Sequence, residues 1–415
     1  MAKRQSSHRR STATRAAGGG IITLLLVAIL LIVSQLTGID LIAILTGQVT
    51  PTSPPPVGTP VAEVASPFLV YFSAPTGSTD PATYVNGPDT IVAAAINDAR
   101  QTVDMAAFEL NARPIADALI AVHRRGVTVR LVTDDDHGLD VSLYEEYLAA
   151  DADEKEDLAD EMETPPDETL LDDLYDAGIP IVDDGRGALM HNKLIIIDGL
   201  DVWAGSMNLT VNGSYRNNNN FIRVRNRRIA ENYQAEFDEM FLNRRFGPRS
   251  PRNTPYPQVT VNGVPVEVYF APEDGVVPPI IAAIEAAQSN IRFLAFSFTL
   301  DEVGSAMLAR ASAGVTVQGV FENVGSETQF SELKRLFCSG LDVRQDGNPF
   351  ILHHKVIIID NQTVLLGSFN FSSSAASDND ENLMIIHDPG VAAQYLAEFE
   401  ARFAEGSAPQ GISCN

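Results

Sequence analysis

The sequence predicts an α/β protein made of two similar halves and preceded by one apolar helix. Two distant stretches, "HNKLIIIDGLDVWAGSMNLT" from His191 and "HHKVIIIDNQTVLLGSFNFS" from His353, are nearly the same. In each half, strand-like patterns alternate with helical patterns of about ten to fifteen residues, which is typical of an α/β sheet. The third observation is an uncharged apolar run from Gly18 to Thr37, about as long as a bilayer is thick.

The first elements of the chain are predicted to lie outside the globular part. Residues 1–17 are basic, and residues 18–37 are predicted to form a transmembrane anchor or, as the alternative, a cleaved signal peptide. The basic residues before the run place the N-terminus in the cytoplasm by the positive-inside rule. The rest of the protein would then face away from the cytoplasm, and would be secreted if the run is cleaved. Residues 38–66, rich in Pro, Thr and Ser, are predicted to be an extended linker.

The remaining chain predicts two lobes, residues 67–250 and 251–415, each long enough to bury its own core. Several segments are echoed: "IVAAAINDARQTVDMAAFEL" by "PIIAAIEAAQSNIRFLAFSF", and "IADALIAVHRRGVTVRLVTDD" by "VGSAMLARASAGVTVQGVFEN". Each lobe is expected to run strand, helix, strand, helix and strand, followed by the His-Lys strand and one strand more. The first lobe also has an acidic segment, residues 141–173, interpreted as a solvated helical insertion because it lacks the spacing of a calcium loop.

The two copies of the motif align without a gap, and the residues that they share are mainly polar. They are His191, Lys193, Asp198, Gly205, Ser206 and Asn208 in the first copy, and His353, Lys355, Asp360, Gly367, Ser368 and Asn370 in the second. Alternate side chains of a strand share a face, so each histidine and its lysine are expected to project together. The glycines suit a tight turn or a close backbone approach, and the aspartates are interpreted as structural.

Two such half-sites, brought face to face, predict a site for phosphoryl transfer. Two lysines and two asparagines would surround the phosphoryl group and balance the charge that grows in the transition state. One histidine would attack phosphorus while the other protonates the leaving oxygen. This chemistry needs no metal and no cofactor, and the sequence gives no sign of a carboxylate cluster that could hold a metal.

The doubled H-x-K-x4-D-x6-G-S-x-N pattern resembles the phospholipase D superfamily, over about Pro67 to Phe403. The resemblance implies two pseudo-twofold-related α-β-α sandwich lobes and a metal-independent phosphodiesterase or transphosphatidylase that acts through a phosphohistidine. Its members include phospholipases, lipid synthases and nucleases, so the resemblance does not fix the substrate. We expect catalytic roles for His191, Lys193, His353, Lys355 and Glu381, and substrate binding by Ser206, Asn208, Asn219, Ser368 and Asn370.

The copies differ at the position of an acidic residue that, in the family, commonly partners the histidine. The second copy has Glu381 there and the first has Asn219. If each residue partners the histidine of its own copy, His191 stays uncharged and is the nucleophile, while the carboxylate makes His353 the general acid. The family habit of using the N-terminal histidine as nucleophile agrees. The alternative is that Asn219 marks a weakened first site.

Charge and cysteine content bear on the substrate and the compartment. The net charge of −25 does not favour a nucleic-acid substrate. A phospholipid is therefore the first hypothesis, with an exported nuclease, a cardiolipin-synthase-like transferase and a degenerate phosphate-binding scaffold as alternatives. No obligate protein partner is indicated. Cys338 and Cys414 are either bridged in an oxidising compartment or two free thiols.

Overall fold

The computed structural model describes residues 66–166 and 168–414, which form one compact unit. The predicted anchor at residues 18–37, the basic segment before it and nearly all of the predicted linker lie outside the described residues. Within the part that is described, no helix is both long and apolar enough to cross a membrane.

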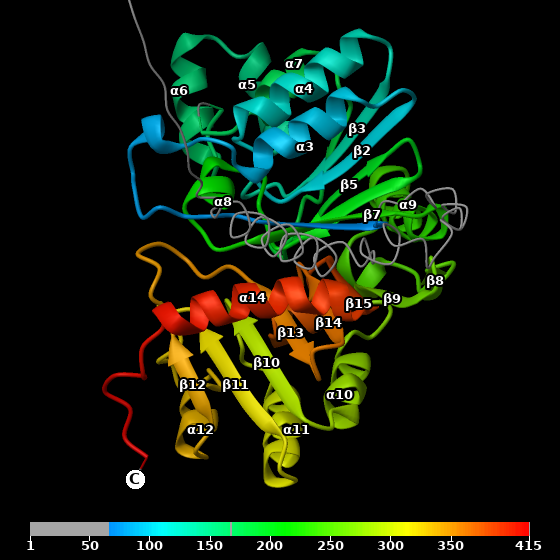
Figure 1. Ribbon diagram of the computed structural model, residues 1–415. Helices are drawn as coiled ribbons and strands as arrows, with labels where there is room; N and C mark the ends of the chain where they lie inside the picture. Colours follow the sequence, from blue (N-terminus) through cyan, green and yellow to red (C-terminus); the bar gives the residue numbers. More distant parts are fainter. Residues whose placement is uncertain (1–65, 167, 415) are drawn as a thin grey trace, which may run out of the picture. The chain divides into compact units, whose positions relative to one another are not determined.

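Two mixed β-sheets form the framework, one in each predicted lobe (Figure 1). The first sheet has the order β1-β7-β6-β5-β2-β3-β4 and the second the order β12-β11-β10-β13-β14-β15-β9-β8. The first consists of β1 (Phe68–Phe72), β2 (Thr102–Ala107), β3 (Thr128–Thr133), β4 (Ile181–Asp183), β5 (Lys193–Ile197), β6 (Asp201–Gly205) and β7 (Asn220–Arg225). The second consists of β8 (Gln258–Val261), β9 (Val264–Ala271), β10 (Asn290–Ala295), β11 (Thr316–Phe321), β12 (Asp342–Gln345), β13 (Lys355–Ile359), β14 (Thr363–Gly367) and β15 (Glu381–His387).

The duplication read from the sequence is present in the topology. When one of the two orders is read backwards, the strands match one to one, and β5 matches β13. Strand β8 is an additional edge strand of the second sheet. In each sheet the motif strand pairs antiparallel with a neighbour on both sides, β2 and β6 for β5, β10 and β14 for β13. Both motif strands are buried at every position, as their unbroken aliphatic sequences predict.

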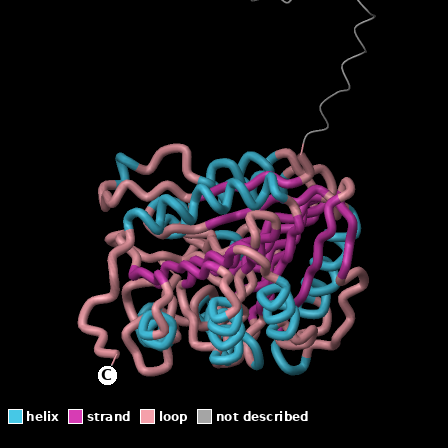
Figure 2. Tube along the Cα trace, turned by 60° about the horizontal axis from the view of Figure 1, so that its bottom comes forward, coloured by secondary structure: helices cyan, strands magenta, loops and turns pink. Residues whose placement is uncertain are grey.

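Helices cover both sheets and also lie between them. The helices are α3 (Pro88–Asn97), α4 (Arg113–Arg124), α5 (Val141–Ala149), α6 (Ala152–Glu161), α7 (Leu171–Asp176), α8 (Val211–Tyr215), α9 (Arg227–Phe241), α10 (Val277–Ala286), α11 (Asp301–Ser312), α12 (Leu333–Cys338), α13 (Ser373–Ser377) and α14 (Pro389–Glu405). Helix α14 runs across the middle of the molecule, between the upper and the lower sheet of Figure 1. In the tube view, strands occupy the centre and helices lie on both sides of them (Figure 2).

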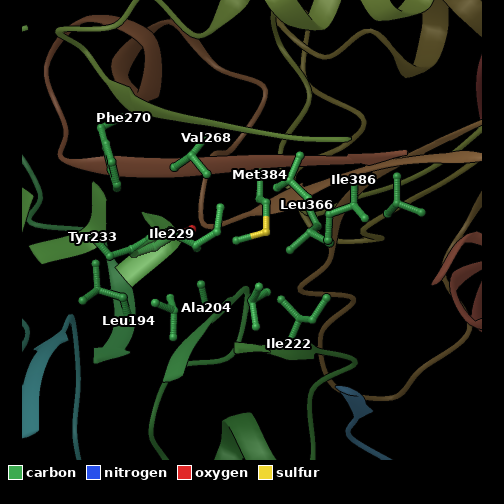
Figure 3. Packing of buried hydrophobic residues seen from close by; sticks show 14 of the residues in the cluster. Leu194, Ala204, Ile222, Ile229, Tyr233, Val268, Phe270, Leu366, Met384 and Ile386 are labelled. Carbon is green, nitrogen blue, oxygen red and sulfur yellow. The ribbon is translucent and has the colours of Figure 1, made fainter. Parts of the chain in front are cut away.

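Each lobe buries a core of its own, and the two lobes also share a third core. Two apolar clusters each belong to one lobe, but a third contains residues of both sheets together with α9 and α14. Figure 3 shows Leu194, Ala204 and Ile222 of the first sheet facing Leu366 and Met384 of the second. The expectation of two self-contained lobes is therefore incomplete, because the inner faces of the two sheets are buried together.

The acidic insertion predicted at residues 141–173 contains α5 and α6 and ends at the start of α7. Helix α7 precedes an edge strand as α12 does in the second lobe, so α5 and α6 are the true surplus of the first lobe. The insertion is helical, as predicted, but not wholly solvated, because Tyr144 and Met162 are buried in the core of the first lobe.

The structure decides between the two alternatives for the cysteines. Cys338, the last residue of α12, is bonded to Cys414. The bridge fastens the C-terminal segment to the second lobe.

The motif aspartates connect the end of each motif strand to a neighbouring turn. Asp198 accepts hydrogen bonds from the backbone N–H groups of Arg100, Gln101 and Thr102. Asp360 accepts them from Gln288, Ser289 and Asn290, at 2.8, 2.7 and 2.9 Å. These contacts fit the interpretation of both aspartates as structural residues.

We expect Asp360→Ala to lower the free energy of unfolding by about 1–3 kcal/mol, because backbone donors lose a charged acceptor. Partial burial acts to raise the pKa of Asp360, but the hydrogen bonds from Asn290 and Gln288 outweigh it, so that the pKa is lowered. The contribution is therefore present above the pKa of the unfolded carboxyl and is lost as the pH falls through the lower, folded one. Thermal unfolding at neutral and acidic pH measures it, with the exposed Asp342→Ala as control. Equal stability of the two variants at neutral pH would contradict the structural role.

Candidate active site

The two motif copies meet where the lobes join. His191 donates its backbone N–H to the carbonyl of Asp380 at 3.0 Å, and His353 donates to that of Asn218 at 2.9 Å. Short bridges pair Met190 with Asp380 and Asn218 with Leu352. Each histidine therefore precedes its strand and is held by the backbone of the opposite lobe. The two segments form one shared site.

The side-chain partners of the histidines are exchanged between the lobes. Nδ1 of His191 lies 2.8 Å from Oε2 of Glu381, and Nδ1 of His353 lies 2.9 Å from Oδ1 of Asn219. The prediction that each histidine is partnered from its own copy was wrong. The reason is the docking of the lobes, which carries the residues just before β7 and at the start of β15 across the interface.

The two lysines are fully buried and lie in the same site. Nζ of Lys193 donates to the carbonyl oxygen of His191 at 2.7 Å, and Nζ of Lys355 donates to that of His353 at 3.0 Å. Each ammonium also lies over a phenylalanine ring, Phe108 at 4.7 Å and Phe296 at 4.6 Å. Burial lowers the pKa of Lys193 to about 8, and burial and the charge of Lys193 lower the pKa of Lys355 well below its usual range. This mutual repulsion suits a site that binds an anion.

Burial opposes charge on the histidines and on Glu381. Burial, followed by the two lysine charges, lowers the pKa of both His191 and His353 well below the usual range. Burial also raises the pKa of Glu381 to about 8. Burial therefore disfavours a fully charged pair of Glu381 carboxylate and His191 imidazolium, although one hydrogen bond joins the two groups. Since Nδ1 of each histidine is engaged, Nε2 is the nitrogen that each ring can offer to a substrate.

The motif glycines allow a close backbone approach, as predicted. A Cβ atom on Gly205 would lie 2.3 Å from the carbonyl oxygen of Asn220, and one on Gly367 would lie 2.1 Å from that of Asn382. Real Cβ atoms essentially never come so close to another atom. The glycines thus let β7 and β15, which carry downstream polar residues, pack closely against the ends of β6 and β14.

The motif serines form hydrogen bonds to residues beside the histidines, whereas each motif asparagine has a buried oxygen without a partner. Ser206 donates to Oδ1 of Asn219 at 2.9 Å, so these two residues hold the ring of His353 from its Nδ1 side. Ser368 accepts from the backbone N–H of Asn382 in the other half. By contrast, Oδ1 of Asn208 and Oδ1 of Asn370 are buried without a hydrogen-bond partner.

Comparisons with known proteins agree with this geometry. A family model described as "Cardiolipin synthase, PLD-like domain" matches residues 92–241 and 280–403, which is more than half of the chain. This chain belongs to the phospholipase D superfamily. Within the superfamily, a phospholipase D of Rickettsia typhi is 33% identical over 142 residues, 34% of this chain and 70% of the relative. The human mitochondrial cardiolipin hydrolase is 30% identical over 121 residues, 29% of this chain and 48% of the relative.

A solved structure of another protein has a similar fold across both lobes. The phosphatidylserine synthase of Haemophilus influenzae is 15% identical and aligns with a TM-score of 0.55 over 81% of this chain and 85% of its own. At this identity the likeness concerns the fold alone.

Several residues of the site were missed by the sequence analysis. Phe108 and Phe296, which lie over the lysines and beside the histidines, occupy matching places in the echoed segments "AAFEL" and "LAFSF". The echo was therefore a usable signal. In a second layer, Asn382 donates to Asn192 at 2.8 Å and Asn220 contacts His354 at 3.0 Å, both between the lobes. Asn220 and Asn382 also occupy matching places after the two motifs, whereas their partners Asn192 and His354 differ in type.

The expectation that carboxylates do not cluster was wrong for the part of the chain that is described. Asp134, Asp135 and Asp184 form one group of three, and Glu236, Glu239 and Glu273 form another. In the first group, Asp134 accepts from the backbone N–H of Met190 at 2.9 Å and Asp184 pairs with Arg186, whereas Oδ1 of Asp135 is buried without a hydrogen-bond partner. The group serves to hold the segment that leads to His191.

Proposed function

We propose that this protein is a phosphodiesterase of the phospholipase D type that cleaves the head-group phosphodiester of a phospholipid through a phosphohistidine. The observation that carries the proposal is the convergence of two buried His-Lys pairs from two lobes on one site. Relatives that bear the names phospholipase D and cardiolipin hydrolase support both the reaction class and the lipid substrate.

The reaction divides into two steps between the same residues. Nε2 of His191 attacks phosphorus, the bond from phosphorus to the head-group oxygen breaks, and His353 gives its proton to that oxygen. Water then attacks the phosphohistidine, His353 takes a proton from the water, and the phosphorus–nitrogen bond breaks to release phosphatidate. Lys193, Lys355, Asn208 and Asn370 bind the phosphoryl oxygens, whose negative charge relieves the repulsion between the lysines.

The N-terminal part of the chain supports a location at a membrane. We propose that residues 18–37 anchor the protein and that the described unit acts outside the cytoplasm, where a disulfide such as Cys338–Cys414 persists. Such an anchor keeps the site near lipid. The net charge of −25 makes a polyanionic nucleic acid a poorer substrate than a single phospholipid.

We expect the full chain to hydrolyse phosphatidylcholine or cardiolipin vesicles in excess EDTA, because the lysines replace a metal at the phosphoryl group. Release of head group and phosphatidate is measured beside single-stranded DNA, at a temperature well below unfolding. Preferential cleavage of DNA would favour the nuclease, and transfer to an added alcohol without hydrolysis would favour the synthase. Activity that is lost in EDTA while the protein stays folded, and is regained with a divalent ion, would contradict metal-independent chemistry.

A further inference from the structure

We propose that Glu236, Glu239 and Glu273 bind one divalent cation of the Ca²⁺ class, at a site separate from the catalytic histidines. Glu236 and Glu239 belong to α9 of the first lobe, whereas Glu273 follows β9 in the second lobe. The cation would therefore connect the two lobes.

The three carboxylates are arranged as ligands of one ion. Each offers an oxygen, and these oxygens all lie within 4.8 Å of one another. Carboxylate oxygens lie about 2.3–2.6 Å from Ca²⁺, so two oxygens on opposite sides of the ion are about 5 Å apart. Glu236 and Glu239 are buried, and Glu273 is only partly buried, which leaves a route for an ion from solvent.

An orphaned acceptor in this cluster points to a ligand independently of the clustering. Glu239 is 2% exposed, and its Oε1 is buried without a hydrogen-bond partner. Its other oxygen, Oε2, accepts from Asn253 at 3.0 Å. In Glu273, Oε2 is likewise buried and without a partner. Native proteins rarely leave buried carboxylate oxygens without a donor or a cation, because the loss of water is then uncompensated.

The second lobe shows how the same position is balanced by a cation. Glu398 of α14 matches Glu236 of α9, and it is paired with His354 and Arg402. In the first lobe, Met240 stands where Arg402 would be, and the neighbouring position on the helix is Glu239. None of the three glutamates forms an ion pair within the described part of the chain. A positive charge supplied by the protein in one half is thus missing from the other.

Burial and mutual repulsion disfavour three charged carboxylates at this place unless a cation balances them. Burial, with repulsion from the other two carboxylates, raises the pKa of Glu236 well above its usual range. Burial raises the pKa of Glu239 to about 7 and that of Glu273 to about 8. A bound divalent ion removes the repulsion and supplies the ligand that the unpartnered oxygens lack.

The site is connected to the catalytic centre through side chains. Glu236 accepts from Asn192 at 3.0 Å, and Asn192 accepts from Asn382 at 2.8 Å. Asn192 lies between His191 and Lys193, and Asn382 follows Glu381. The cation is thus expected to stabilise the contact between the lobes and to position the first histidine, without touching the substrate.

The test is Ca²⁺ binding by the full chain after removal of metals with chelator, measured by isothermal titration calorimetry without substrate. We expect one Ca²⁺ per chain and a higher unfolding temperature in CaCl₂ than in EDTA. Glu239→Gln and the more accessible Glu273→Gln are each expected to weaken binding at least tenfold and to lose the shift. Asp135→Asn, from the other acidic cluster, is the matched control and should bind as the original chain does.

Two results would overturn the proposal. One is the absence of Ca²⁺ binding at millimolar concentration by the folded chain, which means that the three carboxylates share protons instead. The other is unchanged binding in Glu273→Gln together with its loss in Asp135→Asn, which places the ion on the other cluster. Because Glu273 is partly exposed, its variant keeps the test decisive if Glu239→Gln does not fold.

Discussion

Turnover is expected to fall by about 10⁴-fold or more when either His191 or His353 is replaced by alanine. Each half-site supplies one histidine to a single site, and nucleophile and acid act as a unit, so neither half can work alone. The double variant should be hardly slower than the slower of the two single variants, since effects of residues that act together are not additive. Hydrolysis of an unactivated phospholipid by the purified full chain measures this.

The control for this experiment is a histidine elsewhere in the same sheet. His387 lies at the end of β15 and contacts Thr363 and Glu267 rather than the site. His387→Ala should keep nearly full turnover. If either catalytic variant retained a rate within about tenfold of the original, two independent half-sites would explain the protein better than one shared site.

The sequence was sufficient for the first elements of each lobe and for most of the site, but the expected five strands of each lobe did not include β4 and β6 of the first sheet or β8, β12 and β14 of the second. The two motif strands and the glycines beside them could be placed because their reasons are local: strand alternation and a close backbone approach. The motif aspartates were recognised as structural, but their partners in distant turns were not. The duplication indicated the remaining site residues. A buried core does not require the same polar residues to recur in two gapless copies, so their recurrence points to a shared site. The shared core was not foreseen, because an apolar pattern shows that a face is buried but not what covers it.

The partners of the histidines could not be predicted in the same way. Glu381 and His191 are separated by 190 residues, and their contact exists only because the backbone segments at Asp380 and Met190 pair across the interface. Assigning each partner to its own copy assumed that the lobes were independent. The carboxylates of Glu236 and Glu273 were overlooked for the same reason, since a helix of one lobe and a loop of the other bring them together.

The exchange of partners changes the reason for choosing a nucleophile. His191 was expected to be the nucleophile because Asn219, a neutral residue, was expected to be its partner. In the structure Asn219 is the partner of His353 instead, so this reason no longer holds. A carboxylate at Nδ1 suits a nucleophile on other grounds: positive charge grows on the ring as Nε2 bonds to phosphorus, and Glu381 orients the ring and stabilises that charge. This is the role that an acidic residue has toward the histidine of a catalytic triad.

The general acid has the opposite requirement. It must release its proton to the leaving oxygen, and a neutral amide holds that proton less strongly than a carboxylate does. Burial and the two lysine charges lower the pKa of His353 further, which makes its protonated ring a strong acid. The negative charge of a bound phosphodiester is what favours protonation of His353 before the reaction.

The nucleophile can therefore be identified by separating attack from proton donation. His353→Ala should still form a phosphoenzyme with a p-nitrophenyl phosphodiester, whose leaving group needs no acid, and peptide mapping after rapid quenching should find the phosphate on His191. His191→Ala should form none. Glu381→Gln should slow this attack by about 10³–10⁴-fold even with the activated substrate, because a neutral amide cannot stabilise the positive charge that grows on the ring. Asn219→Ala should affect mainly the substrates with poor leaving groups. Phosphate on His353, or equal sensitivity of activated and unactivated substrates to Asn219→Ala, would reverse the two roles.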